Sequence, residues 1–257
     1  MIYIALPDDQ VSRLSFYLAM EEYIAHNIDE DECFYMWQVN PTVIFGRNQL
    51  MENEVNLDYV RANGIETYRR KSGGGCVYAD FSNIMFSYIT KDRNVSFTFL
   101  SYLQRVALTL QKLGVNAIAS GRNDITVDEK KVSGNAFYRT SEKSIVHGTM
   151  LFNTDLEKLV LSITPNDKKL ISKGVESVRK RVTNLSEYLD IDIEEFKRFV
   201  RTHLCDSERT LTYEEVAKIE EIEKEYLSEE FIYGNNPRYT VVKYSYGDAG
   251  DIQVRLE

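Results

Sequence analysis

The chain has 257 residues, with 31 basic and 40 acidic side chains and a formal net charge of −9. This balance disfavours a general nucleic-acid-binding protein, whose surface must neutralise phosphates. Hydrophobic residues make up 43% of the chain and aromatic residues 12%, which excludes a disordered or collagen-like chain and indicates a globular protein with a sizeable core.

The predicted elements begin with a helix and several strands. Apolar residues at helical spacing predict a helix over residues 11–28 that packs on a sheet, with Asp8, Asp9 and Ser12 as candidate caps. Residues 33–39 and 42–45 have the composition of strands, and the Asn40-Pro41 turn between them predicts a hairpin. Further strands are predicted at 65–69, 76–78 and 84–89.

The clearest helix is predicted over residues 96–113, where Ser96 is the expected N-cap and Gly114 the expected stop. The apolar positions that keep the helical period are expected in the core, and they are Leu100, Leu103, Val106, Ala107, Leu110 and Leu113. Strands are then predicted at 115–119, 124–127, 131–138 and 144–152, with a hairpin turn at 128–130.

Surface helices are predicted at 193–204 and 214–227, and final strands at 239–246 and 252–256. Residues 1–182 contain 22 basic and 22 acidic side chains, so residues 183–257 hold the remaining 9 and 18, and with them the whole net charge. Many strands with few helices between them indicate an α+β fold with a mixed, mostly antiparallel sheet and flanking helices.

The cysteines and the apolar segments indicate the cellular compartment in which the protein is expected. Cys33, Cys76 and Cys205 are far apart, with no CxxC pair and no histidine at metal-ligand spacing, which argues against a disulfide framework or structural zinc. No apolar run approaches the length of a membrane span, and the first ten residues lack the basic region of a signal peptide. We therefore expect a cytoplasmic protein that binds neither membrane nor nucleic acid.

A glycine triplet follows three cations in the segment RRKSGGGCVY, residues 69–78. Glycines let the backbone present N–H groups to a closely approaching anion, and the preceding cations suit a phosphate or carboxylate. A flexible turn beside a solvated charge run explains the same pattern. The segment is not a P-loop, because it has no GK[ST] and no helix follows directly.

Two further segments carry candidate ligand-binding cations. SGRNDITV and KKVSGNA, residues 120–127 and 130–136, place Asp124 and Lys131 near each other if the two strands pair. Lys131 could then hold a fixed positive charge against a ligand phosphate, whereas Lys130 reads as an exposed turn lysine. Residues 168–182 carry six cations and one acid, which fits either a basic loop that orders on binding or a solvated surface.

His147 lies in an otherwise apolar strand. A lone histidine in such a strand is more often a hydrogen-bonded structural residue than a catalyst, and we expect it to line a pocket.

Five blocks in order resemble the lipoate–protein ligase A family of the biotin and lipoate ligase superfamily. The blocks are NPTVIFGRNQ (40–49), RRKSGGGCVYAD (69–80), SGRNDITV with KKVSGNAFYR (120–139), HGTMLFN (147–153) and KGVESVRKRVTNL (173–185). The resemblance implies the α+β catalytic domain of these ligases over residues 1–235. Residues 236–257 would either cap that domain or begin a smaller accessory domain, which long ligases carry in full.

The reaction that the resemblance implies has two steps. Lipoate and ATP, with Mg²⁺, would give lipoyl-AMP and pyrophosphate, and a lysine of an acceptor protein would then take the lipoyl group and release AMP. Acceptors would be E2 lipoyl domains of 2-oxoacid dehydrogenases and the glycine cleavage H protein. Some short relatives also depend on a separate accessory polypeptide for the first step.

The resemblance assigns residues to each part of the site. Lys131 would be the central catalytic residue, and Asp124 would orient it or bind Mg²⁺. The residues that would bind ATP and lipoyl-AMP are Arg70, Ser72, Gly73, Gly74, Gly75, Cys76, Val77, Tyr78, Asn83, Asp124 and Lys131. The lipoate pocket would include Gly75, Lys131, Gly134, Ala136 and His147. Lys173, Gly174, Arg179 and Arg181 would belong to the loop that closes over the adenylate.

Two other functions remain open on the sequence. An octanoyl or lipoyl transferase of the same superfamily would move the acyl group between carriers without ATP, and it needs a cysteine nucleophile that faces the lysine. No cysteine stands at the expected place, and Cys76 is read as a packed small residue. A lipoate- or carrier-binding module without adenylation is the non-enzymatic alternative.

Overall fold

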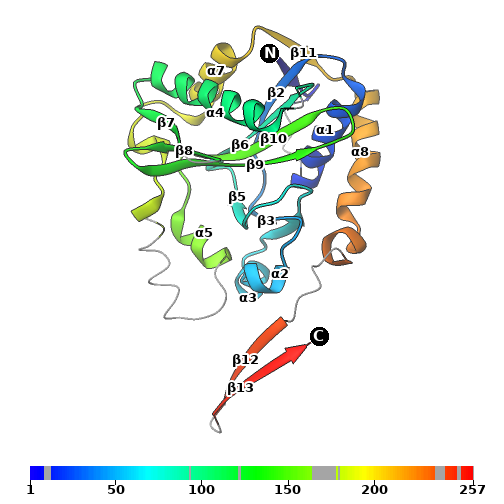
Figure 1. The fold of residues 1–257 in the computed structure, drawn as a ribbon, viewed down its shortest axis with the longest axis vertical. Coiled ribbons are helices and arrows are strands. Elements are labelled where there is room, and N and C mark those ends of the chain that lie inside the picture. Colours follow the sequence, from blue (N-terminus) through cyan, green and yellow to red (C-terminus); the bar gives the residue numbers. More distant parts are fainter. Residues whose placement is uncertain are drawn as a thin grey trace.

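The structure is a computed structural model that describes residues 1–8, 13–92, 94–120, 123–163, 178 and 180–234, and the backbone of 241–247 and 250–256. Its strands form a main sheet of eight, a small sheet of three and a separate two-stranded sheet. Figure 1 shows α4 and α7 on one side of the main sheet and α1 and α8 on the other. Two large apolar clusters fill these two interfaces, and a smaller one supports the small sheet.

The main sheet confirms the expected mixed, mostly antiparallel arrangement. In spatial order its strands are β11 (Ser207–Thr210), β1 (Ile2–Ala5), β2 (Glu32–Trp37), β6 (Asn83–Thr90), β10 (Ser144–Leu151), β9 (Lys130–Arg139), β8 (Asp124–Val127) and β7 (Ala117–Ser120). Strand β1 runs parallel to β11 and to β2, and every other pair of neighbours is antiparallel.

The small sheet corrects the predicted hairpin over residues 33–45. Strand β3 (Thr42–Phe45) pairs in parallel with β4 (Glu66–Arg69) and antiparallel with β5 (Val77–Ala79), while β2 lies in the main sheet between β1 and β6. Both strands are almost wholly buried, so each is paired by distant segments rather than by its neighbour in sequence. The Asn40-Pro41 turn therefore carries the chain from one sheet to the other.

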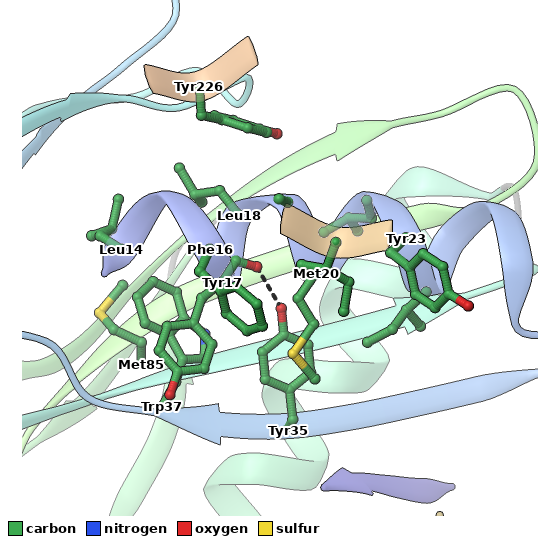
Figure 2. Close-up of a cluster of buried hydrophobic side chains, with 14 of the residues drawn as sticks. Leu14, Phe16, Tyr17, Leu18, Met20, Tyr23, Tyr35, Trp37, Met85 and Tyr226 are labelled. Atoms are coloured by element: carbon green, nitrogen blue, oxygen red, sulfur yellow. Dashed lines mark hydrogen bonds between the residues drawn. The ribbon is translucent and has the colours of Figure 1, made fainter. Parts of the chain in front are cut away.

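Helix α1 (Leu14–Asn27) is buried on nearly all sides because it lies between the main sheet and α8 (Tyr213–Leu227). Figure 2 shows Tyr17 and Trp37 in contact below the helix and Tyr226 of α8 above it. The Tyr35 hydroxyl donates to the Tyr17 carbonyl at 2.8 Å, which fixes the helix on β2 (Figure 2). The predicted helix is confirmed, although it begins after Arg13 without a side-chain cap.

Helix α4 (Val95–Lys112) confirms the clearest helix and corrects its details. Asn94, not Ser96, is the N-cap, because its side-chain oxygen accepts from the Phe97 amide at 3.3 Å. Leu100 is 50% exposed rather than buried. Gly114 has a φ of +84°, a left-handed conformation that suits the predicted stop.

The other helices with described bounds are α2 (Met51–Glu54), α3 (Leu57–Ala62), α5 (Leu156–Ile163), α7 (Ile193–Leu204), η1 (Leu185–Glu187) and η2 (Glu230–Gly234). Asp128 and Glu129 both have positive φ, which matches the tight turn of a two-residue hairpin between β8 and β9. Strands β12 (Val241–Gly247) and β13 (Gly250–Leu256) pair with each other, as expected. Within the described residues, no helix has the length and apolar character that a membrane span requires.

Candidate active site

A cavity of about 310 Å³ lies between the two sheets. Strands β9 and β10 form one wall, and the segment 74–78 with Ile44 forms the other. Its apolar lining includes Leu18, Trp37, Ile44, Val77, Met85 and Leu151. A larger hollow of about 670 Å³ lies against α4 and contains none of the residues that the sequence singled out. The mainly apolar cavity with a few polar groups is therefore the candidate site.

Lys131 reaches this cavity from the start of β9. Its Nζ lies 2.7 Å from Oδ1 of Asp124, which confirms the predicted proximity of the two residues. The carboxylate oxygen has no directed hydrogen bond, so the contact is an ion pair that orients the ammonium group by charge. A Cβ on Gly134 would lie 2.5 Å from both Cε and Nζ of Lys131. Glycine at this position leaves the space in which the ammonium group sits.

Arg70 is almost fully buried and holds the glycine triplet. Its Nη2 donates to the carbonyls of Gly73 and Gly75 at 2.8 and 2.6 Å, and its Nη1 donates to the Ile44 carbonyl at 3.2 Å. Burial lowers the pKa of Arg70 to about 10, so the group is still cationic at neutral pH. It lines the cavity, and its direct contact with a phosphate stays a prediction.

The two flanking cations are also engaged by the protein. The Arg69 guanidinium donates to the carbonyls of Arg47, Gln49 and Ile232 at 2.8 to 2.9 Å. Lys71 pairs with Glu22 at 2.8 Å and with Glu225 at 2.9 Å. The basic run before the glycines is thus neither a solvated charge cluster nor a set of three free phosphate ligands. It ties the glycine segment to α1, α8 and η2.

Replacing Arg69 by lysine is expected to lower the free energy of unfolding by about 2 to 3 kcal/mol. The side chain is 1% exposed, and one ammonium cannot reach three carbonyls that lie in different directions. Urea unfolding followed by the fluorescence of Trp37, the only tryptophan, measures the change. Arg61→Lys on the exposed face of α3 is the matched control and should stay within about 0.5 kcal/mol of the wild type. An equal change in both variants would contradict the proposed role of Arg69.

The other residues predicted to bind the nucleotide divide into two groups. Those that line the cavity are Gly74, Gly75, Cys76, Val77 and Tyr78. Ser72, Gly73 and Asn83 do not line it. Asn83 is fully buried, and its amide donates to the Tyr78 carbonyl at 3.2 Å. Its contact with a nucleotide stays a prediction, whereas its support of the Tyr78 backbone is observed.

All residues predicted for the lipoate pocket line the cavity, namely Gly75, Lys131, Gly134, Ala136 and His147. His147 is also a hydrogen-bonded structural residue, as the simpler interpretation expected. Its Nε2 lies 2.7 Å from the Ser72 hydroxyl, and its Nδ1 lies 2.8 Å from a carboxylate oxygen of Glu21.

The closing loop falls largely outside the described residues, which include Arg181 but not Lys173, Gly174 or Arg179. Where the chain is described again, Val178 and Val182 line the cavity. The Thr183 amide donates to the Lys131 carbonyl at 3.0 Å. The segment that follows the basic loop is therefore anchored on the backbone of the central lysine.

Sequence reasoning missed several residues of the cavity. Asn123, Asn135 and Thr149 add polar groups, and a Cβ on Gly148 would collide with the Asn135 side chain. Asn135 lies in the KVSGNAF motif four residues after Lys131, so its closeness in sequence to Lys131 could have indicated it. No local pattern pointed to Glu21, because a helical carboxylate normally faces solvent.

Comparison with known proteins gives a consistent result. A model of the lipoyl protein ligase A/B catalytic domain matches residues 14–205. Lipoate–protein ligase 1 of Staphylococcus aureus (strain Mu50) is 38% identical over 249 residues, which cover 93% of this chain and 76% of that protein.

Solved structures of similar fold agree with the sequence match. A bi-partite lipoate protein ligase from Thermoplasma acidophilum, studied with its E2 lipoyl domain, aligns with a TM-score of 0.82 and 28% identity over 93% of this chain and 98% of that chain. A lipoate–protein ligase A bound with ATP aligns with a TM-score of 0.78 and 27% identity over 91% and 99% of the two chains.

Proposed function

Because the chain belongs to the lipoyl protein ligase A/B family, we propose that it activates lipoate with ATP and transfers the lipoyl group to a lysine of an acceptor protein. The observation that carries this function is Lys131, a cation that lines a mainly apolar cavity together with Gly74 and Gly75 of the glycine segment. Lipoate has an aliphatic chain with a carboxylate at its end, so it matches an apolar cavity with a cation.

In the first step a carboxylate oxygen of lipoate attacks the α-phosphorus of ATP, and pyrophosphate leaves. Two anions must approach each other, and the Lys131 ammonium would neutralise both while stabilising the charge that develops on the phosphate. Asp124 would hold that ammonium in place through the ion pair. Gly74 and Gly75 would offer backbone to the nucleotide, while Arg70 fixes the carbonyls of Gly73 and Gly75.

Asp124 is also the residue through which Mg²⁺ would bind. Magnesium in nucleotide sites is held by one or two carboxylates together with phosphates and water, and it offsets the negative charge of the leaving pyrophosphate. The described residues contain no group of three or more potential metal-ligating side chains. One carboxylate beside the cavity suits an ion that arrives with ATP rather than a resident metal.

In the second step the amine of an acceptor lysine would attack the acyl carbon of lipoyl-AMP, and AMP would leave as the amine loses a proton. We propose E2 lipoyl domains and the glycine cleavage H protein as acceptors. The Thermoplasma acidophilum relative, which was studied with its E2 lipoyl domain, supports the first of these. The basic loop around residues 168–182 would exclude water from the mixed anhydride between the two steps.

We also propose that residues 1–235 are the catalytic domain and that residues 236–257 either cap it or begin an accessory domain. The self-paired hairpin of β12 and β13 and the family match over residues 14–205 support this division.

The three cysteine thiols argue against a carrier-to-carrier transferase that uses a cysteine nucleophile. Burial raises the pKa of Cys76, which lines the cavity, to about 12, and it raises the pKa of Cys33 and Cys205 to about 11 and about 12. With a pKa near 12, only about one thiol in ten thousand is ionised at pH 8, so the thiolate needed for attack is nearly absent.

Replacing Cys76 by serine is therefore expected to leave lipoyl transfer within about twofold of the wild type, because the residue acts by packing. Alkylation of Cys76 by iodoacetamide, followed by peptide mass, should stay slow at pH 8 and accelerate only as the pH approaches its raised pKa. Loss of transfer in Cys76→Ser with intact fold and lipoyl-AMP binding would favour the transferase.

The function itself is tested with the full chain, ATP, Mg²⁺, lipoate and an E2 lipoyl domain, by measuring the mass of the domain. We expect one lipoyl group to be added, and only when ATP is present. Transfer from a lipoyl carrier without ATP would indicate a transferase instead. Lipoate binding without any transfer would indicate a binding module, and transfer only after addition of a small partner protein would indicate a split enzyme.

A further inference from the structure

Glu21 on helix α1 is a fully buried carboxylate, with 0% exposure, that the reaction described above does not use. It lies 2.8 and 2.9 Å from Nδ1 of His147 through its two oxygens. The Ser87 hydroxyl donates to it at 2.6 Å, and the Tyr138 hydroxyl donates at 3.3 Å. Among the described residues, no lysine or arginine is within ion-pair distance of Glu21.

The partners of His147 define where its protons lie. An ionised carboxylate only accepts hydrogen bonds, so Nδ1 facing Glu21 must carry a proton. On the other side, Ser72 Oγ lies 2.7 Å from Nε2 and already accepts from Arg70 Nε at 3.0 Å. Ser72 is fully buried, and its own proton needs an acceptor. An unprotonated Nε2 accepts this proton, an arrangement in which the proton of His147 is on Nδ1.

The same contacts link two buried charges of opposite sign. Arg70 has no carboxylate within ion-pair distance among the residues described, and Glu21 has no strong cation beside it. Ser72 and His147 form a hydrogen-bonded chain between them, in which every donor points from the guanidinium toward the carboxylate. A buried charge without compensation is costly, and hydrogen-bond chains of one direction strengthen each of their members.

A serine, a histidine and a carboxylate in series also form the arrangement of a nucleophilic triad. Ser72 does not line the cavity, and its oxygen is enclosed between Arg70 and His147. This series of hydrogen bonds therefore positions Arg70, and Ser72 does not act as a nucleophile.

We propose that Glu21 is a positioning residue of the site: through His147 and Ser72 it holds Arg70, and with it the glycine segment, in the arrangement that receives the nucleotide. The carboxylate is also linked to Trp37, which lines the cavity. Ser87 Oγ donates to Glu21 and accepts from Nε1 of Trp37 at 2.9 Å. One buried carboxylate thus orients a wall of the acyl pocket and the nucleotide loop together. The kinetic part of this inference rests on the proposed function.

The proton arrangement is measured first, by ¹⁵N NMR of the full chain labelled in its histidine rings. The chain has only three histidines, and a His147→Gln sample assigns the signals. At pH 7 we expect His147 to show one protonated nitrogen, Nδ1, and one unprotonated nitrogen, Nε2. A doubly protonated ring, or a proton on Nε2 alone, would overturn the proposal, and this result needs no variant of Glu21.

The positioning role is measured with Glu21→Gln against the control Glu223→Gln. Glu223 is also a buried carboxylate, 2% exposed, that accepts from Arg13 and Ser15, but it lies on α8 away from the cavity. Both variants should lower the thermal midpoint. Only Glu21→Gln should lower kcat for lipoyl-AMP formation and raise the KM for lipoate, so that kcat/KM falls at least about tenfold. An unchanged kcat/KM in Glu21→Gln, or the same loss of kcat/KM in both variants, would contradict the proposed role of Glu21.

Failure of this inference and failure of the proposed function give different results. A wild-type chain that forms no lipoyl-AMP removes the function but leaves the NMR test valid. An active wild type with the wrong proton arrangement removes the positioning role alone.

Discussion

Replacing Lys131 by alanine is expected to lower the rate of lipoyl-AMP formation by about a thousandfold or more, because the variant loses the cation at which two anions must meet. Its Nζ is held 2.7 Å from Asp124 beside the cavity, and Gly134 leaves room for it. Quench-flow detection of lipoyl-AMP from labelled ATP measures the step directly. The fold should be retained, since the side chain is 37% exposed and carries little of the core.

The neighbouring lysine provides the control for this variant. Lys130 precedes Lys131 in β9 but does not line the cavity, so Lys130→Ala should keep the rate within about twofold. Lys131→Arg should also be slow, because a planar guanidinium is bulkier than the ammonium that Gly134 accommodates. Near-normal adenylation in Lys131→Ala would contradict the assignment of the central residue.

Replacing Gly134 by alanine is expected to lower the same rate by about a hundredfold, because a displacement of about 1 Å in a catalytic group has effects of that size. The new Cβ would lie 2.5 Å from Cε and Nζ of Lys131, so the ammonium must move. The collision is with the flexible end of a side chain, and alanine is less unfavourable than glycine inside a strand. The free energy of unfolding should therefore change by no more than about 1 kcal/mol. Quench-flow kinetics and urea unfolding of one sample separate the two effects.

A double variant tests whether Gly134 acts through Lys131. Adding Gly134→Ala to Lys131→Ala should cause almost no further loss, because the group that is displaced is already gone. Full additivity of the two losses would mean that Gly134 contributes in another way, for example by direct contact with the substrate.

The elements most visible in the sequence were those fixed by local signals. Gly114 stops α4 and the Asp128-Glu129 turn joins β8 to β9, because both depend on backbone conformations that few residues adopt. The hairpin expected over residues 33–45 was wrong because its two strands are paired by distant segments in different sheets. Local patterns do not encode such pairings.

The parts of the site that could be predicted are those formed by residues close together in the sequence. Lys131 and Asp124 meet because β8 and β9 pair across the Asp128-Glu129 turn, with Lys131 opposite Thr126 and Asp124 opposite Gly134. The glycine triplet is visible as composition. The roles of Arg69 and Lys71 were not visible, since their partners Ile232 and Glu225 come from the last part of the described chain. Glu21 was equally hidden, because nothing near it in sequence explains a carboxylate inside a core.

The acidic last third of the chain has a structural use in this arrangement. Glu223 of α8 accepts from Arg13 at 2.7 and 3.0 Å, and Glu225 pairs with Lys71. These carboxylates attach α8 to α1 and to the segment before the glycines. Part of the negative charge of residues 183–257 therefore supports the glycine segment, through the pair of Glu225 with Lys71.

The most direct test of the account is release of pyrophosphate from ATP by the purified full chain, measured with and without lipoate. We predict release that requires lipoate and that Lys131→Ala abolishes while Lys130→Ala retains it. Release that is independent of lipoate, or that persists undiminished in Lys131→Ala, would contradict the claim that this cavity activates lipoate at Lys131.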